Sequence, residues 1–397
     1  MSEWKKVKLG DCCIKIGSGS TPKGGSTVYI DAGTSLIRSQ NVYNLTFDYN
    51  GLTHITEDAA KKLNGVTIIK NDILLNITGD SVARTCIVPD DVLPARVNQH
   101  VAIVRVDGNT MNSNYLSYYL ASPKMQAYML SLAVGKGASR NAMTKQMIEK
   151  FEVPCPPLDI QIRIASILTR YDSLIENYQK QIKLLEEAAQ RLYKEWFVDL
   201  RFPGHENTKI VDGVPEGWEK KKLIDLVDVQ YGYTFDGRLF NSNGEGMPIL
   251  RIRNIPDGIT SDYTTEEASP NYIIHDGDIV VGMDGIFHIN SWNGGDAYLV
   301  QRACSFRPKE ERTKGFIFQA IQEPIKYFEQ TLVGATVAHL GKKHIDSIEL
   351  IAPSNRDLYI PFQKGFNQRQ YLLSQIRLLT DARDRLLPKL MSGEITV

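Results

Sequence analysis

The segment LDIQIRIASILTRYDSLIENYQKQIKLLEEAAQRLYKEWF, residues 158–197, carries an apolar residue at every third or fourth position. This spacing predicts one long helix with a continuous apolar stripe, as in a coiled coil. The run Pro154-Cys155-Pro156-Pro157 stops any regular element before it, and Asp159 can cap the helix start. At 1.5 Å per residue a helix from Ile160 to Phe197 would be about 57 Å long. Because a small domain cannot bury such a stripe, a partner helix is expected.

The sequence supplies that partner, because Gln181-Ile182-Lys183-Leu184-Leu185 returns as Gln375-Ile376-Arg377-Leu378-Leu379. A second apolar stripe surrounds this copy, from Leu358 to Leu390. Pro361 suits the first turn of a second helix, and Pro388 is expected to kink its end. The alternative is that each helix belongs only to the core of its own domain.

Other blocks repeat in the same order, which indicates an internal duplication. Residues 36–42 match residues 249–255, and residues 71–75 match residues 277–281. The predicted fold class is α+β, with two pseudo-symmetric globular domains of mixed strands and helices, separated by two long antiparallel coiled-coil helices. The predicted boundaries are 1–157 and 201–354 for the globular domains, and 158–200 and 355–397 for the helices.

The charge balance, the cysteine spacing and the lengths of the apolar stretches exclude several classes of protein. Lys plus Arg and Asp plus Glu both number 46, so the net charge of zero provides no global attraction to nucleic acid, and any such surface must be local. The five cysteines form no C-x-x-C, and the start is polar, which favours a reducing cytoplasm. No stretch reaches the length of about 18 apolar residues that a membrane span needs.

Signals for catalysis are weak. Residues 19–26 have the glycines of a phosphate loop, but Gly25 stands where the lysine is required. There is no G-x-S-x-G, no H-E-x-x-H and no Asn/Asp-Pro-Pro-aromatic motif. Asp80, Asp278 and Asp284 adjoin glycines, which fits turns and leaves open an enzyme that modifies or cleaves DNA. A helical scaffold for protein assembly is the other alternative.

Polar residues of the types that contact DNA flank the predicted strands and fill one basic loop. Arg, Asn and Gln can bond base edges, while Lys, Ser and Thr suit phosphates. The predicted DNA contacts are Arg38, Gln40, Asn41, Asn76, Thr78, Arg96, Asn98, Gln99, Lys136, Ser139, Arg140, Asn141, Arg251, Arg253, Asn254, Gln301, Arg302, His339, Lys342 and Lys343, with His100 beside Gln99. Because the aligned loops differ, the two domains are expected to read two different short sequences.

The chain resembles the specificity subunit of type I restriction-modification systems. The similarity rests on Trp4 to Leu9 and Trp218 to Leu223 at the domain starts, on the joint Pro156-Pro157-Leu158, on the repeated pentapeptide, and on Arg385 to Glu394 near the end. It implies a non-catalytic, DNA-binding subunit in which each globular domain reads one half of a bipartite asymmetric site.

The resemblance also implies partners. The helices would set the gap between the half-sites and dock two methyltransferase subunits. The residues predicted to form these spacer and partner helices are Ile164, Ile167, Tyr171, Leu174, Tyr178, Ile182, Leu185, Leu192, Leu372, Ile376, Leu379 and Leu386. Those subunits would carry S-adenosylmethionine, and a restriction and translocase subunit would use ATP and magnesium. No cofactor, metal or membrane is expected for this chain itself.

Overall fold

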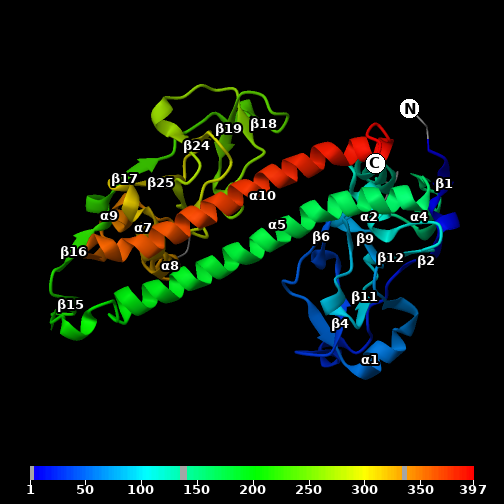
Figure 1. The fold of residues 1–397 in the computed structure, drawn as a ribbon, viewed down its shortest axis with the longest axis horizontal. Helices are drawn as coiled ribbons and strands as arrows, with labels where there is room; N and C mark the ends of the chain where they lie inside the picture. The colour runs from blue at the N-terminus through cyan, green and yellow to red at the C-terminus, as the bar shows by residue number, and fades with distance from the viewer. Residues whose placement is uncertain (1–3, 135–140, 333–337) are drawn as a thin grey trace. The chain divides into compact units, whose positions relative to one another are not determined.

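The computed structural model describes residues 4–134, 141–332 and 338–397 (Figure 1). The chain divides into two compact units. Unit 1 comprises Met1–Leu174 and Leu379–Val397, and unit 2 comprises Ile175–Leu378. In the described part of the chain, no helix is both long and apolar enough to cross a membrane.

Two sheets form the body of unit 1. The first is antiparallel, in the order β10 (Thr85–Ile87), β9 (Ile73–Asn76), β12 (Val101–Val106) and β2 (Cys13–Ser18). The second has the order β3 (Tyr29–Ile30), β7 (Thr53–Ile55), β4 (Thr34–Ile37), β11 (Ala95–Val97) and β8 (Thr67–Ile68), in which β4 and β11 are parallel. The helices of the unit are α1 (Glu57–Lys62), α2 (Ser113–Ala121), α3 (Pro123–Ala133) and α4 (Lys145–Glu149), together with parts of two long helices.

Strand β9 shows why the first sheet lies between two apolar layers. All four of its residues are buried. Successive side chains of a strand point to opposite faces. Ile73 and Leu75 accordingly join the core that includes α2 and α3, whereas Leu74 joins the core shared with β4 and β11. A strand covered on both faces has a continuous apolar run, as Ile73-Leu74-Leu75 does in the block that matches residues 277–281.

Unit 2 repeats the strand order of these two sheets, while the small pairs β5 (Val42–Tyr43) with β6 (Thr46–Phe47) in unit 1 and β14 (Ile210–Val211) with β15 (Val214–Pro215) in unit 2 lie outside the repeat. Its antiparallel sheet has the order β23 (Ile289–Ser291), β22 (Ile279–Gly282), β25 (Ala303–Pro308) and β17 (Val227–Tyr231). Its second sheet has the order β18 (Phe240–Asn241), β20 (Tyr263–Thr264), β19 (Met247–Leu250), β24 (Ala297–Leu299) and β21 (Ile273–Ile274), with β19 and β24 parallel. Helices α7 (Lys314–Ala320), α8 (Gln322–Thr331) and α9 (Lys342–Asp346) follow in the order of α2, α3 and α4. The predicted duplication of a mixed α and β domain is therefore confirmed.

A short strand pair closes each globular domain. In unit 1, β1 (Lys6–Lys8) pairs antiparallel with β13 (Glu152–Pro154). In unit 2, β16 (Trp218–Lys222) pairs in the same way with β26 (Glu349–Pro353). The first and last strands of each domain are thus neighbours, and a long helix begins a few residues later.

The two long helices are α5 (Leu158–Tyr193), which continues into a π-helical turn at Lys194–Val198, and α10 (Ile360–Ser392). Within unit 1, Ile164 and Leu168 from the start of α5 share a core with Leu387 and Leu390 from the end of α10. The Arg383 guanidinium bonds the Asp172 carboxylate at 2.7 Å. Burial alone would lower the pKa of Arg383, but this hydrogen bond and charge attraction outweigh burial and raise the pKa.

Within unit 2 the other ends of the helices meet. Tyr193, at the end of α5, stands edge-on to Phe362 near the start of α10, with ring centroids 6.3 Å apart. Arg369 is buried and bonds Glu186 of α5 at 2.6 Å. The apolar stripe predicted from the sequence is only partly buried, because Leu174 exposes 43% of its surface whereas Leu372 is almost fully covered.

One ion pair that occurs in both units provides a stability prediction. Asp72, fully buried, accepts two bonds from Arg105 at 2.7 and 2.8 Å, whereas the equivalent Asp278 lies 4.0 Å from Arg307. Removing one partner of a buried pair leaves an uncompensated charge, which costs about 3 kcal/mol. The Asp278–Arg307 pair is only partly buried and its atoms are 4.0 Å apart, so it contributes less than about 1 kcal/mol. We expect Asp72→Asn to destabilise unit 1 by about 3 kcal/mol and Asp278→Asn to leave unit 2 within about 1 kcal/mol.

Hydrogen exchange of the β9 and β22 amides measures the two units separately. Each variant leaves one unit unchanged, and that unit is the internal control. Equal losses of protection in the two units would contradict the prediction.

Candidate nucleic-acid interface

A hollow of about 550 Å³ opens where several loops of unit 1 meet. Its residues come from the turn after β4, the segment between β9 and β10, the approach to β12 and the chain that follows residue 140. They are Ser39, Gln40, Tyr43, Thr78, Gly79, Asp80, Ser81, Arg84, His100, Asn141 and Ala142, and we call this the unit 1 hollow. The structure thus brings the predicted contacts Gln40, Thr78, His100 and Asn141 together.

The centre of the unit 1 hollow is a pair of side chains held by backbone contacts. Thr78 Oγ1 lies 2.6 Å from His100 Nδ1. The amide of Ile77 donates to the carbonyl of His100 at 3.0 Å, and the amide of Gly79 donates to the carbonyl of Asn141 at 2.9 Å. Three distant segments are therefore fixed at one point. The result is a rigid polar surface of the kind that orients side chains toward a base edge.

Sequence reasoning missed Arg84 and Tyr43. The Arg84 guanidinium lies over the Tyr43 ring, 4.4 Å from its centroid. Stacking on an aromatic ring leaves the guanidinium N–H groups available at its edge, where they can bond a phosphate or a base. Neither residue belongs to the blocks that repeat in the second half, so the alignment of the two halves carried no signal for them.

Unit 2 has an equivalent arrangement with different side chains. Asp284 Oδ2 lies 2.8 Å from Arg302 Nη1, and Asp284 Oδ1 lies 2.5 Å from His339 Nδ1. The backbone contacts repeat those of unit 1, because Met283 donates to Arg302 and Gly285 donates to Ala338. By these contacts Asp284 matches Thr78, Arg302 matches His100, and His339 matches Ala142.

Four predicted contacts in unit 1 belong to the framework instead, which corrects the sequence prediction. Asn41 Nδ2 donates to the Asp48 carbonyl and Asn41 Oδ1 accepts from the Arg38 amide, so this buried side chain holds the turn after β4. Asn76 is fully buried and donates to the Ser39 carbonyl.

Arg96 is buried with its guanidinium on the Ala60 carbonyl and the Asn64 side chain. Asn98 is buried and accepts from the amide of His100. A polar residue after a strand fits a turn cap as well as a base contact, and burial leaves these four no surface for DNA.

The remaining predicted contacts are partly or fully exposed. Arg38 donates to the Gly51 carbonyl, Gln99 accepts from Thr21, and Gln301 accepts from Thr234 at 3.0 Å. In unit 2, Arg251 stacks on Phe240, Asn254 caps the turn after β19, Arg253 pairs with Asp262, and Lys342 and Lys343 are exposed at the start of α9. Lys136, Ser139 and Arg140 lie outside the described residues.

The carboxylates considered for catalysis do not converge within unit 2. Asp278 precedes β22, where its side chain accepts from the His275 amide at 3.1 Å, and Asp284 follows the same strand. Among the described residues, no three His, Cys, Asp or Glu side chains are placed to hold a metal ion.

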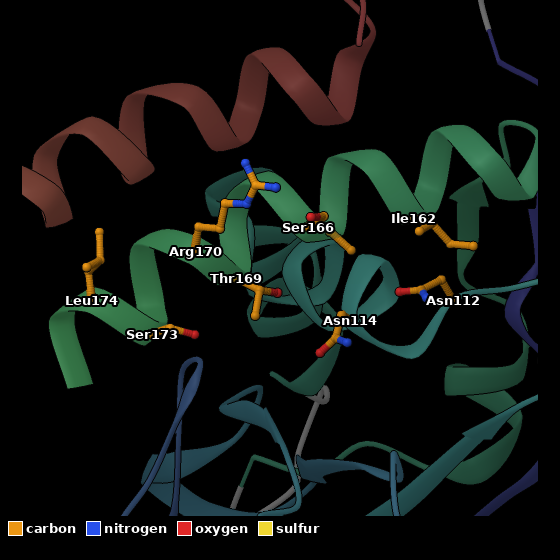
Figure 2. A pocket seen from close by; sticks show the side chains of 9 residues that line it. Asn112, Asn114, Ile162, Ser166, Thr169, Arg170, Ser173 and Leu174 are labelled. Carbon is orange, nitrogen blue, oxygen red and sulfur yellow. The ribbon is translucent and has the colours of Figure 1, made fainter. Parts of the chain in front are cut away.

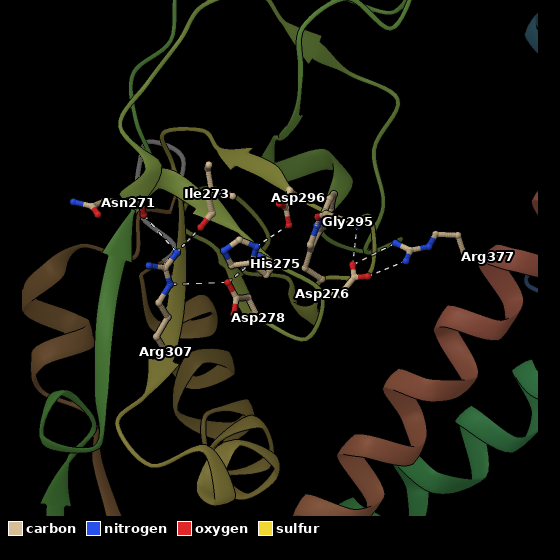
Figure 3. A network of polar contacts seen from close by, with 10 residues as sticks. Asn271, Ile273, His275, Asp276, Asp278, Gly295, Asp296, Arg307 and Arg377 are labelled. Carbon is tan, nitrogen blue, oxygen red and sulfur yellow. Dashed lines mark hydrogen bonds and ion pairs between the residues drawn. The ribbon is translucent and has the colours of Figure 1, made fainter.

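A polar network joins this part of unit 2 to α10 (Figure 3). Arg377 of α10 donates to Asp276 at 2.9 Å and to the Asn293 carbonyl at 2.6 Å. Asp276 also accepts from the Gly295 amide, while His275 pairs with Asp296 at 2.7 Å. The globular domain of unit 2 is thereby attached to its stretch of α10 through polar contacts, in addition to the aromatic core.

A second open hollow, of about 640 Å³, follows α5 within unit 1 (Figure 2). Ile162, Ser166, Thr169 and Leu174 line it from α5, and Asn112 and Asn114 line it from the start of α2. Ile162 and Leu174 are exposed apolar residues. This face of α5 is thus a mixed polar and apolar surface.

The chain matches the family described as "Type I restriction modification DNA specificity domain" twice, over residues 1–187 and 215–363. It therefore belongs to the type I restriction-modification DNA specificity family. It is 26% identical to the type I restriction enzyme MjaIX specificity subunit of Methanocaldococcus jannaschii, across 100% of this chain and 94% of that protein. It is 24% identical to the HindI specificity subunit of Haemophilus influenzae, across 100% of both chains.

The fold has a solved counterpart. The crystal structure of the type I restriction-modification S subunit from M. genitalium superposes with a TM-score of 0.59 at 16% identity, across 98% of this chain and 96% of that one. The resemblance inferred from the sequence is therefore confirmed at the level of family and fold.

Proposed function

We propose that this chain is the DNA-reading, non-catalytic subunit of a type I complex, and that each unit reads one half of a bipartite asymmetric site. The observation that carries the proposal is the repeated arrangement around Thr78 and Asp284. The same backbone frame presents different side chains in the two units. Two copies of one backbone arrangement that present different polar side chains are suited to recognise two different base sequences.

In this proposal the two long helices form an antiparallel pair that sets the gap between the half-sites. The support is that the start of α5 meets the end of α10 in unit 1, whereas the end of α5 meets the start of α10 in unit 2. The cross-helix pairs Asp172–Arg383 and Glu186–Arg369 add specific polar contacts. In this proposal the helices paired in this way act as the spacer.

The partners of the proposed complex are double-stranded DNA, two methyltransferase subunits and a restriction and translocase subunit. The exposed face of α5 that contains Ile162 and Leu174 is a surface of the kind on which a methyltransferase subunit would dock. S-adenosylmethionine would be bound by the methyltransferase subunits, and ATP and magnesium by the restriction subunit. This chain would determine the DNA site at which the reaction occurs and would catalyse no step of it.

Mapping of N6-methyladenine in cellular DNA tests the proposal. We expect one split, asymmetric motif to be methylated when the chain is present and unmethylated when its gene is deleted. Restoring the gene in trans is the control, and it should restore the same motif. A motif that stays methylated after deletion would contradict the proposed function.

A further inference from the structure

Arg302 in unit 2 and His100 in unit 1 occupy matched positions but carry different side chains, and the arginine points to the base that unit 2 recognises. Resting on the proposed function, we infer that Arg302, held by Asp284, reads a guanine in the half-site bound by unit 2. We further infer that the Thr78–His100 pair occupies the same reading position in unit 1, where it reads another base. These two pairs would then be the specificity-determining residues at one equivalent position of each half-site.

The equivalence rests on backbone contacts. The carbonyl of Arg302 accepts from the amide of the first residue after β22 at 2.8 Å, and the carbonyl of His100 accepts from the amide of the first residue after β9 at 3.0 Å. Each residue directly precedes the long central strand of its sheet, β25 in unit 2 and β12 in unit 1. The backbone hydrogen bonds are shared, but the turn conformation differs, because Arg302 has a φ of +71° whereas His100 has no positive φ. Unit 2 presents an ionic pair at this position, and unit 1 presents a hydroxyl–imidazole pair.

The side chain of Arg302 suits a guanine. Its relative exposure is 67%, and its Nη1 is the atom engaged by Asp284. An arginine has five N–H donors, so Nη2 and Nε remain to form two parallel bonds. Guanine presents the two acceptors O6 and N7 in the major groove, and this pairing is the commonest specific arginine contact.

The carboxylate of Asp284 indicates that Arg302 binds a base edge and not a phosphate. Asp284 is only 17% exposed, and both of its oxygens are engaged, one by Arg302 and one by His339. A carboxylate 2.8 Å from the guanidinium cancels much of the attraction for a phosphate anion. A neutral base edge suffers no such repulsion, and the fixed guanidinium bonds it without losing further side-chain freedom.

The backbone of Arg302 supports a functional position. Its φ is +71°, in the left-handed region that non-glycine residues seldom adopt. Strained conformations of this kind persist where the surroundings fix them, and they concentrate at binding sites. Arg302 combines this backbone conformation with an exposed side chain that pairs with Asp284.

The test uses the full chain, purified with the subunits it assembles with, and a double-stranded DNA library with a randomised 30-base-pair segment. Selection and sequencing of bound DNA yield the motif of each variant. For Arg302→Lys, which keeps the charge but loses the two-bond fork, we expect the preference for guanine to fall at least about tenfold at one position of one half-site. The other half-site should stay unchanged.

The matched control is Arg312→Lys. Arg312 is 61% exposed in the same unit and pairs with Glu310 at 3.2 Å, away from the reading position. It should leave the whole motif unchanged. If Arg302→Lys retains every guanine preference of the wild-type chain, the inference is wrong while the proposed function stands. If the wild-type chain selects no motif, both are wrong.

Transfer of the pair provides an independent test. The double variant Thr78→Asp and His100→Arg places the unit 2 side chains on the unit 1 frame. We expect the half-site read by unit 1 to gain a guanine preference at one position, with the other half-site unchanged. A thermal unfolding profile like that of the wild-type chain establishes that the variant is folded. A folded variant without a new guanine preference would overturn the equivalence of the two positions.

Discussion

On the proposed function, inserting one heptad into each long helix is expected to abolish recognition of the bipartite site. The insertion points are between Leu174 and Ile175 and between Leu378 and Leu379, where the two compact units divide. A copy of residues 175–181 adds about 10 Å to each helix, or about three base pairs of DNA at 3.4 Å per pair. Because three base pairs are also about a quarter of a turn, both half-sites can no longer be reached together.

Loss of joint binding should lower the affinity for the natural site by at least about a hundredfold, since two linked readers gain that much from effective concentration. Competition binding with DNA duplexes of graded gap length measures the effect. A three-heptad insertion of about 32 Å, close to one turn of DNA at 34–36 Å, is the matched variant. It should bind again when the gap is about nine or ten base pairs longer. Wild-type affinity for the natural gap in the one-heptad variant would show that the helices do not set the gap.

Trp292→Ala is expected to have the largest effect on stability. Trp292 is fully buried between the two sheets of unit 2, in a core with Leu250, Val280 and Leu299. Its indole N–H donates to the Gly295 carbonyl. Replacing a buried aromatic residue by alanine costs about 3–5 kcal/mol, from lost transfer energy and the cavity that remains.

Hydrogen exchange of β22 and β24 amides measures this loss, and the β9 amides of unit 1 serve as the internal reference. The matched control is Tyr327→Ala, because Tyr327 is an aromatic residue of the same unit that exposes 62% of its surface. Its removal should change the free energy of unfolding by less than about 0.5 kcal/mol. Similar losses for the two variants would mean that the core does not depend on Trp292.

The long helices and the duplication could be predicted because their signals are periodic and repeated. The apolar stripe before Trp196 predicts a helix from its spacing alone. The prediction that Asp159 caps this helix is wrong, because α5 begins at Leu158 and Asp159 lies in its first turn. The first residue of the second helix is harder to predict from the sequence. Leu358 was assigned to its stripe but lies in a 3-10 turn, and α10 begins at Ile360. An apolar stripe also does not show how much of its length other elements bury, so the exposure of Leu174 could not be predicted.

The candidate site was harder to predict, because a polar residue after a strand has several uses. Asn41 and Gln40 are adjacent in the sequence, yet Asn41 is buried as a turn cap and Gln40 lines the unit 1 hollow. Only tertiary contacts separate the two roles. The Arg84–Tyr43 stack joins residues that are far apart in the chain, so no local sequence pattern predicts this contact.

The strand pairs β1–β13 and β16–β26 have a consequence for how such a protein can change over generations. Because each globular domain starts and finishes on adjacent strands, its chain enters and leaves at one place. A domain with neighbouring ends can be replaced by another of different sequence without moving the helix that follows, since the splice points stay fixed in space. On the proposed function, a single recombination event that exchanges the segment between two such strands would therefore create a subunit that recognises a different DNA sequence, while the long helices proposed to dock the partner subunits stay unchanged.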